Sequence, residues 1–285
     1  MNSLIQFLLI LVTCLNSYIL IYISFNNLSG KIPPQIGLLI NSEVLHLAKK
    51  ALFLRDNQLS GPISPGIGNL MELTALLLDA THFTCFLPQN LCHCGSLQLL
   101  RADSNDLIGP IPKTLINYRN LIRVHLERNQ IFGNMSEDFG VYKNLQYMNL
   151  SYNRFYGEIS HNWGKCTQLT TLKIVGYNIS GRIPLEIGDL VQLQLLDLSS
   201  NHLVGEVPKE FRKFTYLSKL MLNGNKLCGG LPLELGSLIN LEYLDLSTNK
   251  FGKEIPRNIG NLLKLHNLNM SNNKFILNIP VQMCE

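Results

Sequence analysis

The sequence has few charged residues and no tract of a single charge sign. Asp, Glu, Lys and Arg make up 15% of the 285 residues, and the net charge of +4 is spread thinly along the chain. A nucleic-acid-binding protein usually concentrates its Lys and Arg on one face or along one helix. The sequence therefore argues against a nucleic-acid partner, and its 46% apolar content fits one extended domain of a secreted protein.

The sequence also lacks the motifs of common enzyme classes. It has no glycine-rich phosphate loop, no V-A-I-K lysine, no H-R-D loop and no nucleophile elbow. Asp138-Phe139-Gly140 spells the D-F-G of kinases, but it occupies the position that Glu186-Ile187-Gly188 holds in another repeat. Cys92-His93-Cys94 is too closely spaced for a usual zinc pair and no second pair follows. The sequence thus predicts no enzyme, no cofactor and no metal site.

What the sequence does contain is a period of 24 residues. Steps of 24 from Asn57 reach ten positions, and eight of them are Asn, with Thr81 and Tyr177 as the exceptions. Repeats of about 20 to 29 residues that read L-x-x-L-x-L-x-x-N-x-L are leucine-rich repeats. The predicted fold is therefore an α/β leucine-rich repeat solenoid, with a curved parallel β-sheet and short helical or 3-10 outer segments.

The repeat pattern has a physical basis. Leucines two apart, such as Leu244 and Leu246, lie on the same side of a strand and bury between coils, while Tyr243 and Asp245 point outward. The amide side chain of the Asn can bond backbone groups that a sharp turn leaves without partners. We therefore expect the Asn positions to mark the turn that ends each strand.

The segments after the turns carry a family resemblance. Leu28-Ser29-Gly30-Lys31-Ile32-Pro33 and Ile179-Ser180-Gly181-Arg182-Ile183-Pro184 are similar to the L-x-G-x-I-P repeats of plant extracellular proteins. The stretch 136–166 resembles the ectodomains of receptor kinases related to the receptor for SCOOP peptides, the MDIS-interacting receptor-like kinase group. The resemblance implies a secreted peptide ligand on the concave face and a leucine-rich repeat kinase as co-receptor. It also implies a location at the extracellular face of the plasma membrane or in the apoplast.

The first 56 residues depart from the regular repeat. Residues 1–17 form an apolar leader, which the sequence favours as a signal peptide over a membrane anchor. Residues 18–56 form degenerate repeats, in which Lys50 lies 24 residues after Asn26 and only seven before Asn57. This spacing predicts an internal deletion and a local irregularity at residues 41–56; an irregular loop is the alternative. Residues 57–285 form regular repeats that stop within a repeat, so membrane contact is expected only through the leader or a missing C-terminal helix.

The cysteines are not arranged as a disulfide framework. Cys94 and Cys166 occupy equivalent positions three coils apart, about 14 Å at the usual strand spacing, which is beyond disulfide reach. Only Cys85 with Cys92 or Cys94 could bridge. The other cysteines are expected to be buried thiols.

The variable outward positions before each Asn contain a cluster of charged and aromatic residues. Later repeats have small polar residues at these positions, as at Asp245 and Ser247. A peptide could be held here by charge-assisted hydrogen bonds and aromatic contacts, but the same residues could merely solvate the sheet. The predicted ligand-binding residues are Arg101, Asp103, Arg123, His125, Glu127, Tyr147, Asn149, Tyr152 and Lys173.

Two classes of function remain open. Sequons for N-glycosylation, consistent with secretion, occur at Asn27, Asn134, Asn149, Asn178 and Asn269. The first function is the ligand-binding ectodomain, or a fragment of it, of a plant leucine-rich repeat receptor-like serine/threonine kinase in signalling or immunity. The second is a secreted decoy or inhibitor-like scaffold that binds proteins and does not signal.

Overall fold

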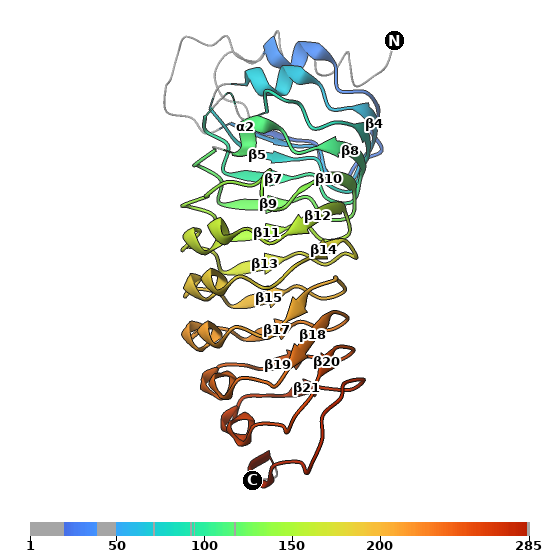
Figure 1. Cartoon of the computed structure of the whole chain (residues 1–285). Helices are drawn as coiled ribbons and strands as arrows, with labels where there is room; N and C mark the ends of the chain where they lie inside the picture. Colours follow the sequence, from blue (N-terminus) through green and yellow to red (C-terminus); the bar gives the residue numbers. More distant parts are fainter. Residues whose placement is uncertain are drawn as a thin grey trace. The chain divides into compact units, whose positions relative to one another are not determined.

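The computed structural model describes residues 20–38, 50–70, 72–91, 93, 95–116 and 118–283. The predicted leader at residues 1–17 lies outside this part of the chain. The chain divides into two compact units, Met1–Gly133 and Asn134–Glu285. In each unit, successive coils contribute one short strand each to a parallel sheet, which we call the front sheet, and a second row of short strands follows the turns (Figure 1).

The first unit has five described strands in its front sheet. They are β1 (Leu20–Tyr22), β3 (Lys50–Phe53), β5 (Leu73–Leu77), β7 (Leu99–Arg101) and β9 (Arg123–His125). Its outer strands are β2 (Ser29–Gly30), β4 (Gln58–Pro62), β6 (His82–Cys85), β8 (Asp106–Pro110) and β10 (Gln130–Asn134), which ends at the unit boundary. Short helices follow at η1 (Pro34–Leu38), η2 (Pro65–Asn69) and α2 (Lys113–Ile116).

The second unit is more regular. Its front strands are β11 (Tyr147–Asn149), β13 (Thr171–Lys173), β15 (Leu195–Asp197), β17 (Lys219–Met221), β19 (Tyr243–Asp245) and β21 (Asn267–Asn269). Its outer strands are β12 (Arg154–Glu158), β14 (Ile179–Ser180), β16 (Val204–Gly205), β18 (Lys226–Gly229) and β20 (Lys250–Phe251). Its 3-10 helices are η3 (His161–Lys165), η4 (Leu185–Asp189), η5 (Lys209–Lys213), η6 (Leu233–Ser237), η7 (Arg257–Asn261) and η8 (Val281–Met283).

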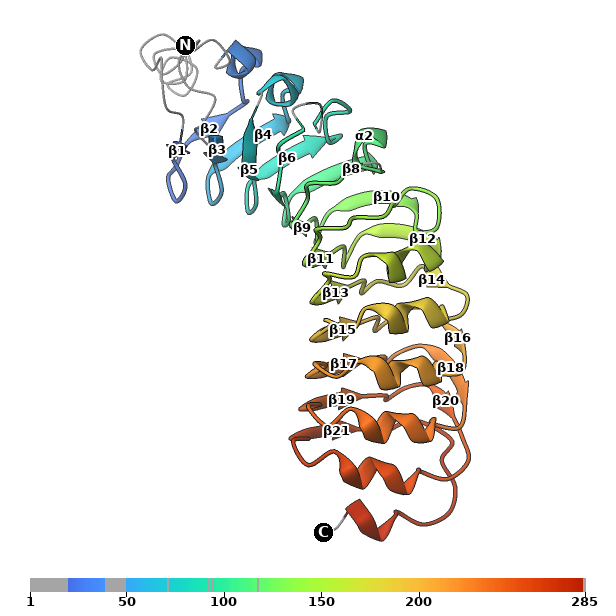
Figure 2. The ribbon, with the colours of Figure 1, turned by 90° about the vertical axis from the view of Figure 1, so that its left-hand side faces the viewer.

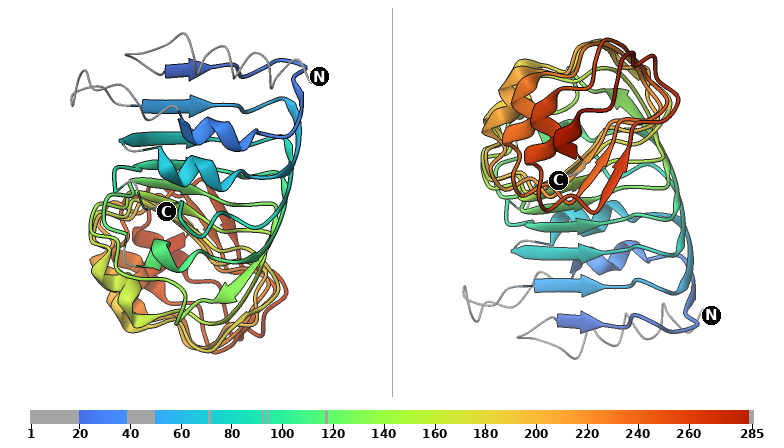
Figure 3. Two further views of the ribbon diagram at one scale, coloured as in Figure 1. Left: turned by 90° about the horizontal axis from the view of Figure 1, so that it is seen from above. Right: turned by 90° about the horizontal axis from the view of Figure 1, so that it is seen from below.

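The parallel register within each unit confirms the predicted 24-residue coil. Thr171 of β13 pairs with Leu195 of β15, and Leu195 pairs with Lys219 of β17. In Figure 2 the 3-10 helices of the second unit are stacked in one column. Its front strands lie along one edge of the view and its outer strands along the opposite edge. Its coils overlie one another when seen end on (Figure 3). The predicted solenoid of parallel strands and short 3-10 segments is therefore confirmed.

The interior of the coils is apolar, as the leucine pattern predicts. Leu244 and Leu246 are fully buried, and Trp163 is 1% exposed. The ring of Phe139 lies 5.6 Å from Trp163 and 5.5 Å from Phe155, measured between ring centroids. Phe139 is thus a core residue of its coil, and Asp138 accepts a hydrogen bond from the backbone nitrogen of Asn134 at 2.7 Å. The D-F-G triplet is part of the repeat structure.

The repeated Asn side chains bind the coils to one another. The Nδ2 group of Asn249 donates to the carbonyl oxygens of Leu246, Ser247 and Leu222, the last in the preceding coil. Its Oδ1 accepts from the backbone nitrogen of Leu227 in that same coil at 3.0 Å. The amide of Asn249 therefore satisfies backbone groups of two coils, as predicted for a turn residue. Tyr177, which replaces Asn in one coil, is instead 69% exposed.

The internal deletion predicted before Asn57 stays a prediction, because the coil that would carry it includes residues outside the described part of the chain. Lys50 is the first residue of strand β3, and Ala51 pairs directly with Leu20 of β1. Asn57 donates to the carbonyl oxygen of Ile23, which ties the turn after β3 to the end of β1. An irregularity is present, because the register between β3 and β5 shifts between Lys50 and Ala51. Residues 41–49 of the predicted irregular segment lie outside the described residues.

The described residues include no helix that combines the length and apolar character needed to cross a bilayer.

Candidate functional site

The front sheet of the first unit carries a row of charged side chains at equivalent positions in successive coils. Arg101, the last residue of β7, pairs with His125, the last residue of β9. Two residues further along each coil lie Asp103 and Glu127, and Asp79 holds the same position after β5. Because the strands are parallel and in register, one step of 24 residues places each side chain beside its counterpart. We call Arg55, Asp79, Arg101, Asp103, His125 and Glu127 the charged row.

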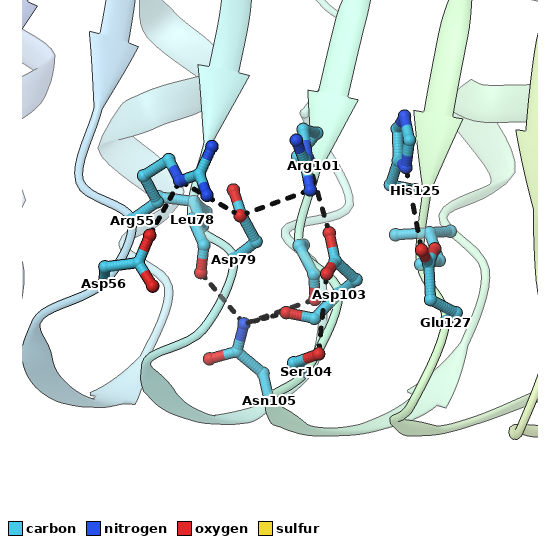
Figure 4. Close-up of polar contacts among 12 residues, drawn as sticks. Arg55, Asp56, Leu78, Asp79, Arg101, Asp103, Ser104, Asn105, His125 and Glu127 are labelled. Carbon is cyan, nitrogen blue, oxygen red and sulfur yellow. Dashed lines mark hydrogen bonds and ion pairs between the residues drawn. The ribbon is translucent and has the colours of Figure 1, made fainter. Parts of the chain in front are cut away.

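Arg101 lies between two carboxylates. Its terminal nitrogen is 3.4 Å from Oδ2 of Asp79, and its Nε is 3.5 Å from Oδ1 of Asp103 (Figure 4). The Nε of Arg55 is also 3.4 Å from Oδ2 of Asp79 and donates to Asp56 at 2.8 Å. The two arginines thus share Asp79, which is only 2% exposed. Sharing one buried carboxylate between two guanidinium groups fixes their positions.

The other end of the charged row has more negative than positive groups. Nδ1 of His125 lies 3.7 Å from Oε1 of Glu127. Burial raises the pKa of Asp103, and the carboxylates of Glu127 and Asp79 raise it further, against the opposing effects of Arg101 and His125. Burial and the neighbouring carboxylates therefore disfavour the charged form of the Asp103 carboxyl group.

Three carboxylates of the charged row have oxygens without hydrogen bonds. Within the described residues, Oδ1 of Asp79, Oδ1 of Asp103 and Oε2 of Glu127 are buried and lack a hydrogen-bond partner. The approach of Arg101 to Asp103 is an ion pair, but the Nε of Arg101 also lacks a hydrogen bond. Buried polar atoms in folded proteins are nearly always paired, so this group of exceptions in one place makes the charged row the candidate site.

The remaining predicted residues lie in the second unit. Tyr147 pairs with Thr171, and Asn149 pairs with Lys173, across strands β11 and β13. Tyr152 is 53% exposed at the turn after β11, where its φ is 56°. Asn149 is buried, at 7% exposure, and its Oδ1 accepts from the backbone nitrogen of Ser151 at 3.1 Å. Asn149, the last residue of β11, therefore presents little surface, and its role in ligand binding stays a prediction.

The nine predicted residues thus fall into two groups. Arg101, Asp103, Arg123, His125 and Glu127 are in the first unit, and Tyr147, Asn149, Tyr152 and Lys173 are in the second. Asp79 contacts Arg101, and Arg55 contacts Asp79, but the prediction included neither residue. Both lie two residues before a turn position, at Asn57 and Thr81, so the repeat register could have found them.

Carboxylates on the front sheet of the second unit have a different role. Oδ1 of Asp197 accepts from the backbone nitrogen and hydroxyl of Ser199 at 3.1 and 2.6 Å. Oδ1 of Asp245 accepts from the backbone nitrogen of Ser247 at 2.9 Å. Burial raises the pKa of Asp197, while the bonds from Ser199 oppose that effect. These carboxylates are bound within their own coil, which distinguishes them from the charged row.

The cysteines are placed partly as predicted. Cys166 is a buried thiol whose Sγ lies 3.3 Å from the backbone nitrogen of Tyr142, and burial raises its pKa. Cys228 is exposed, so the prediction of a buried thiol is wrong there, because β18 turns this position outward. Cys85 is an exposed free thiol. Its predicted partners Cys92 and Cys94 lie outside the described residues.

Glycosylation at the predicted sequons is expected to follow the exposure of each Asn. Asn27 and Asn178 are exposed, whereas Asn149 is buried against the turn backbone. A glycan on Asn149 would require that turn to open, so we expect occupancy at Asn178 and none at Asn149. Glycopeptide mass spectrometry of the chain secreted from plant cells measures both sites, and full occupancy at Asn149 would contradict the burial of its side chain.

Comparison with known proteins agrees with this architecture. Residues 138–274 match the family model described as a leucine-rich repeat region. The fold is a leucine-rich repeat solenoid. No curated protein matches the chain.

The structure is similar to those of plant leucine-rich repeat receptor ectodomains. The plant peptide hormone receptor RGFR1, solved in complex with RGF2, has a TM-score of 0.77 and 31% identity over 92% of this chain and 45% of that chain. The PEPR1–AtPEP1 structure has a TM-score of 0.82 and 35% identity, with coverage of 92% and 39%. The chain thus spans less than half the length of these two receptors.

A plant ice-binding protein is also similar, with a TM-score of 0.69 and 26% identity. This likeness covers 88% of this chain and 81% of that chain.

Proposed function

We propose that the chain is part of the ectodomain of a plant leucine-rich repeat receptor kinase and binds a secreted peptide on the front sheet of its first unit. The observation that carries the proposal is the charged row, in which buried carboxylates of three successive coils retain oxygens without hydrogen bonds. The likeness to RGFR1 and PEPR1, both solved with a peptide, supports the same kind of ligand.

The geometry of the charged row suits an extended peptide. Equivalent side chains on neighbouring parallel strands repeat at about 4.8 Å, so the row from Asp79 to Glu127 covers about 10 Å, or roughly three residues of extended chain. Arg101 and Arg123 can donate to carbonyl or carboxylate oxygens, and Asp103 and Glu127 can accept from amide or cationic groups. Arg123 is exposed and His125 half-buried, so both can contact a ligand without first being uncovered.

A peptide selection on the full chain tests the proposal. The secreted chain would be panned against a phage-displayed library of random peptides of about ten residues, and selected peptides measured by surface plasmon resonance. We expect Arg123→Ala and His125→Ala each to raise Kd at least about tenfold, because each removes a polar contact at the centre of the site.

The repeat supplies matched controls for these variants. Lys219 and Met221 occupy in β17 the positions that Arg123 and His125 occupy in β9. Lys219→Ala and Met221→Ala are expected to leave peptide affinity unchanged, and circular dichroism checks that all four variants are folded. Equal Kd values for the two pairs of variants would overturn the assignment of the site to the first unit.

Two finer parts of the proposal come from the sequence resemblance. The first is the relationship to the receptor for SCOOP peptides, and the second is a leucine-rich repeat kinase as co-receptor. A pull-down that recovers such a kinase ectodomain with this chain only when the selected peptide is present would support the second part.

A second candidate is a secreted repeat protein without signalling activity. The likeness to a plant ice-binding protein, at 26% identity over 88% of this chain, supports it. Sequencing of the transcript on both sides of the region that encodes Met1 to Glu285 distinguishes the candidates. A reading frame that continues into a membrane-spanning helix and a kinase favours the receptor, and one without them favours the second candidate.

A further inference from the structure

We propose that Asp103, His125 and Glu127 form a binding site for a divalent transition-metal ion of the Zn²⁺ class. One nitrogen of His125 and one carboxylate oxygen each from Asp103 and Glu127 lie within 4.8 Å of one another. The side chains of Asp103, His125 and Glu127 are 13%, 14% and 17% exposed. The three ligands are therefore held in a largely water-excluded place, unlike a chance group of surface carboxylates.

The fold brings the three residues together from two neighbouring coils. His125 ends strand β9, and Glu127 follows two residues later on the same side of the chain. Asp103 holds the same position as Glu127, one coil earlier. It lies two residues after Arg101, which pairs with His125 in the sheet. Parallel register thus places an imidazole and two carboxylates around one point. Figure 4 shows the His125 ring directed toward Glu127, with Asp103 on the adjacent coil.

The buried oxygens without hydrogen bonds are a second, independent observation in favour of cation binding. Oδ1 of Asp103 and Oε2 of Glu127 are buried without a hydrogen bond, although Arg101 lies 3.5 Å from Asp103. Two carboxylates of like charge at close range destabilise each other unless a proton or a cation lies between them. A bound dication would supply that charge and satisfy both oxygens.

The donor set selects the class of ion. Zn²⁺ binds His nitrogen and carboxylate oxygen at about 2.0 to 2.2 Å, so ligand atoms on one ion lie at most about 4.4 Å apart. The three ligand atoms lie within 4.8 Å of one another, and small rotations of the Glu127 and Asp103 side chains would bring them within this limit. Ca²⁺ prefers six to eight oxygen ligands and Mg²⁺ an octahedron of oxygens, so an imidazole with two carboxylates favours Zn²⁺ and its neighbours in the series. Three protein ligands leave a fourth position open.

The experiment is titration of the metal-stripped full chain with ZnCl2 by isothermal calorimetry, without any peptide. We expect one ion to bind with an affinity that falls at least about 100-fold in His125→Gln and Asp103→Asn, because each removes a ligand. Arg101→Gln is expected to bind about tenfold more tightly, since it removes the cation that competes for Asp103. Circular dichroism without metal verifies that the variants are folded.

The chain offers a matched control. His161 lies 2.8 Å from the carboxylate of Glu186, but this pair is exposed and no third ligand is grouped with it among the described residues. His161→Gln should therefore leave the zinc titration unchanged. Substitution of Co²⁺ separates this site from any cysteine site, because thiolate ligands give a charge-transfer absorption that imidazole and carboxylate do not.

The inference is overturned if the wild-type chain binds no zinc or if His125→Gln binds zinc as tightly as the wild type. It is also overturned if Arg101→Gln shows no gain in zinc affinity, or if the Co²⁺ spectrum shows that the only bound ion has thiolate ligands. Since no peptide is present, failure of the peptide proposal leaves this result unaffected.

Discussion

Trp163→Ala is expected to lower the free energy of unfolding by about 3 to 5 kcal/mol, because it leaves a cavity in a closely packed interior. Trp163 is 1% exposed and packs against Phe139, whose ring centroid is 5.6 Å away. Its Nε1 has no hydrogen-bond partner among the described residues. Urea denaturation, followed by circular dichroism, measures the change.

Trp163→Phe is the informative companion variant. It keeps most of the ring volume and removes an indole N–H that is buried without a partner, so we expect a loss well below that of Trp163→Ala. Tyr177→Ala, at a site that is 69% exposed, serves as the surface control and should be within about 0.5 kcal/mol of the wild type. A small effect of Trp163→Ala would mean that this coil is not packed as described.

Asn249→Ala is expected to lower the free energy of unfolding by about 3 kcal/mol. The variant removes the bonds from Nδ2 to Leu222, Leu246 and Ser247 and the bond from Leu227 to Oδ1. Each of the backbone groups left buried without a partner costs about 1 kcal/mol or more, and partial rescue by water reduces the sum. The same urea titration measures the loss.

Asn240→Ala is the matched control for this prediction. Asn240 is also an Asn of the second unit, but its bonds to Thr215 and Lys264 are at the surface. Surface bonds exchange readily with water, so we expect a change below about 1 kcal/mol. Similar losses for the two variants would show that the Asn positions do not hold the coils together.

The sequence predicted the repeat structure well because each coil depends on its own 24 residues and on its immediate neighbours. Asn249 and Leu244 could be assigned from position alone, and the structure places both as expected. The region before Asn57 was harder to predict. Lys50 falls 24 residues after Asn26, but it begins strand β3, which pairs directly with β1, so the 24-residue step does not mark a turn there.

The candidate site was predicted in part. The register identified Arg101, Asp103, His125 and Glu127 as unusual residues on the front sheet, but it did not show that Asp79 ties Arg55 to Arg101. The proposed metal ligands were missed because they form no short motif in the chain. Asp103 and His125 are 22 residues apart, and only the parallel register of β7 and β9 makes them neighbours.

The position of Cys228 shows a further limit. Cysteines favour buried sites in general, but Cys228 lies on β18, where alternate residues point outward. Leu227 beside it is fully buried. The strand geometry decides which of two neighbouring apolar residues is exposed, and composition alone does not show it.

The central claim is that the charged row of the first unit binds ligand, and carboxyl footprinting tests it most directly. The chain would be labelled with a carbodiimide and an amine, with and without a saturating peptide from the selection, and the modified residues quantified by mass spectrometry. The account predicts that labelling of Glu127 falls on peptide binding, while labelling of Glu234, which lies on η6 in the second unit, stays constant. Unchanged labelling of Glu127 in a saturated complex would contradict it.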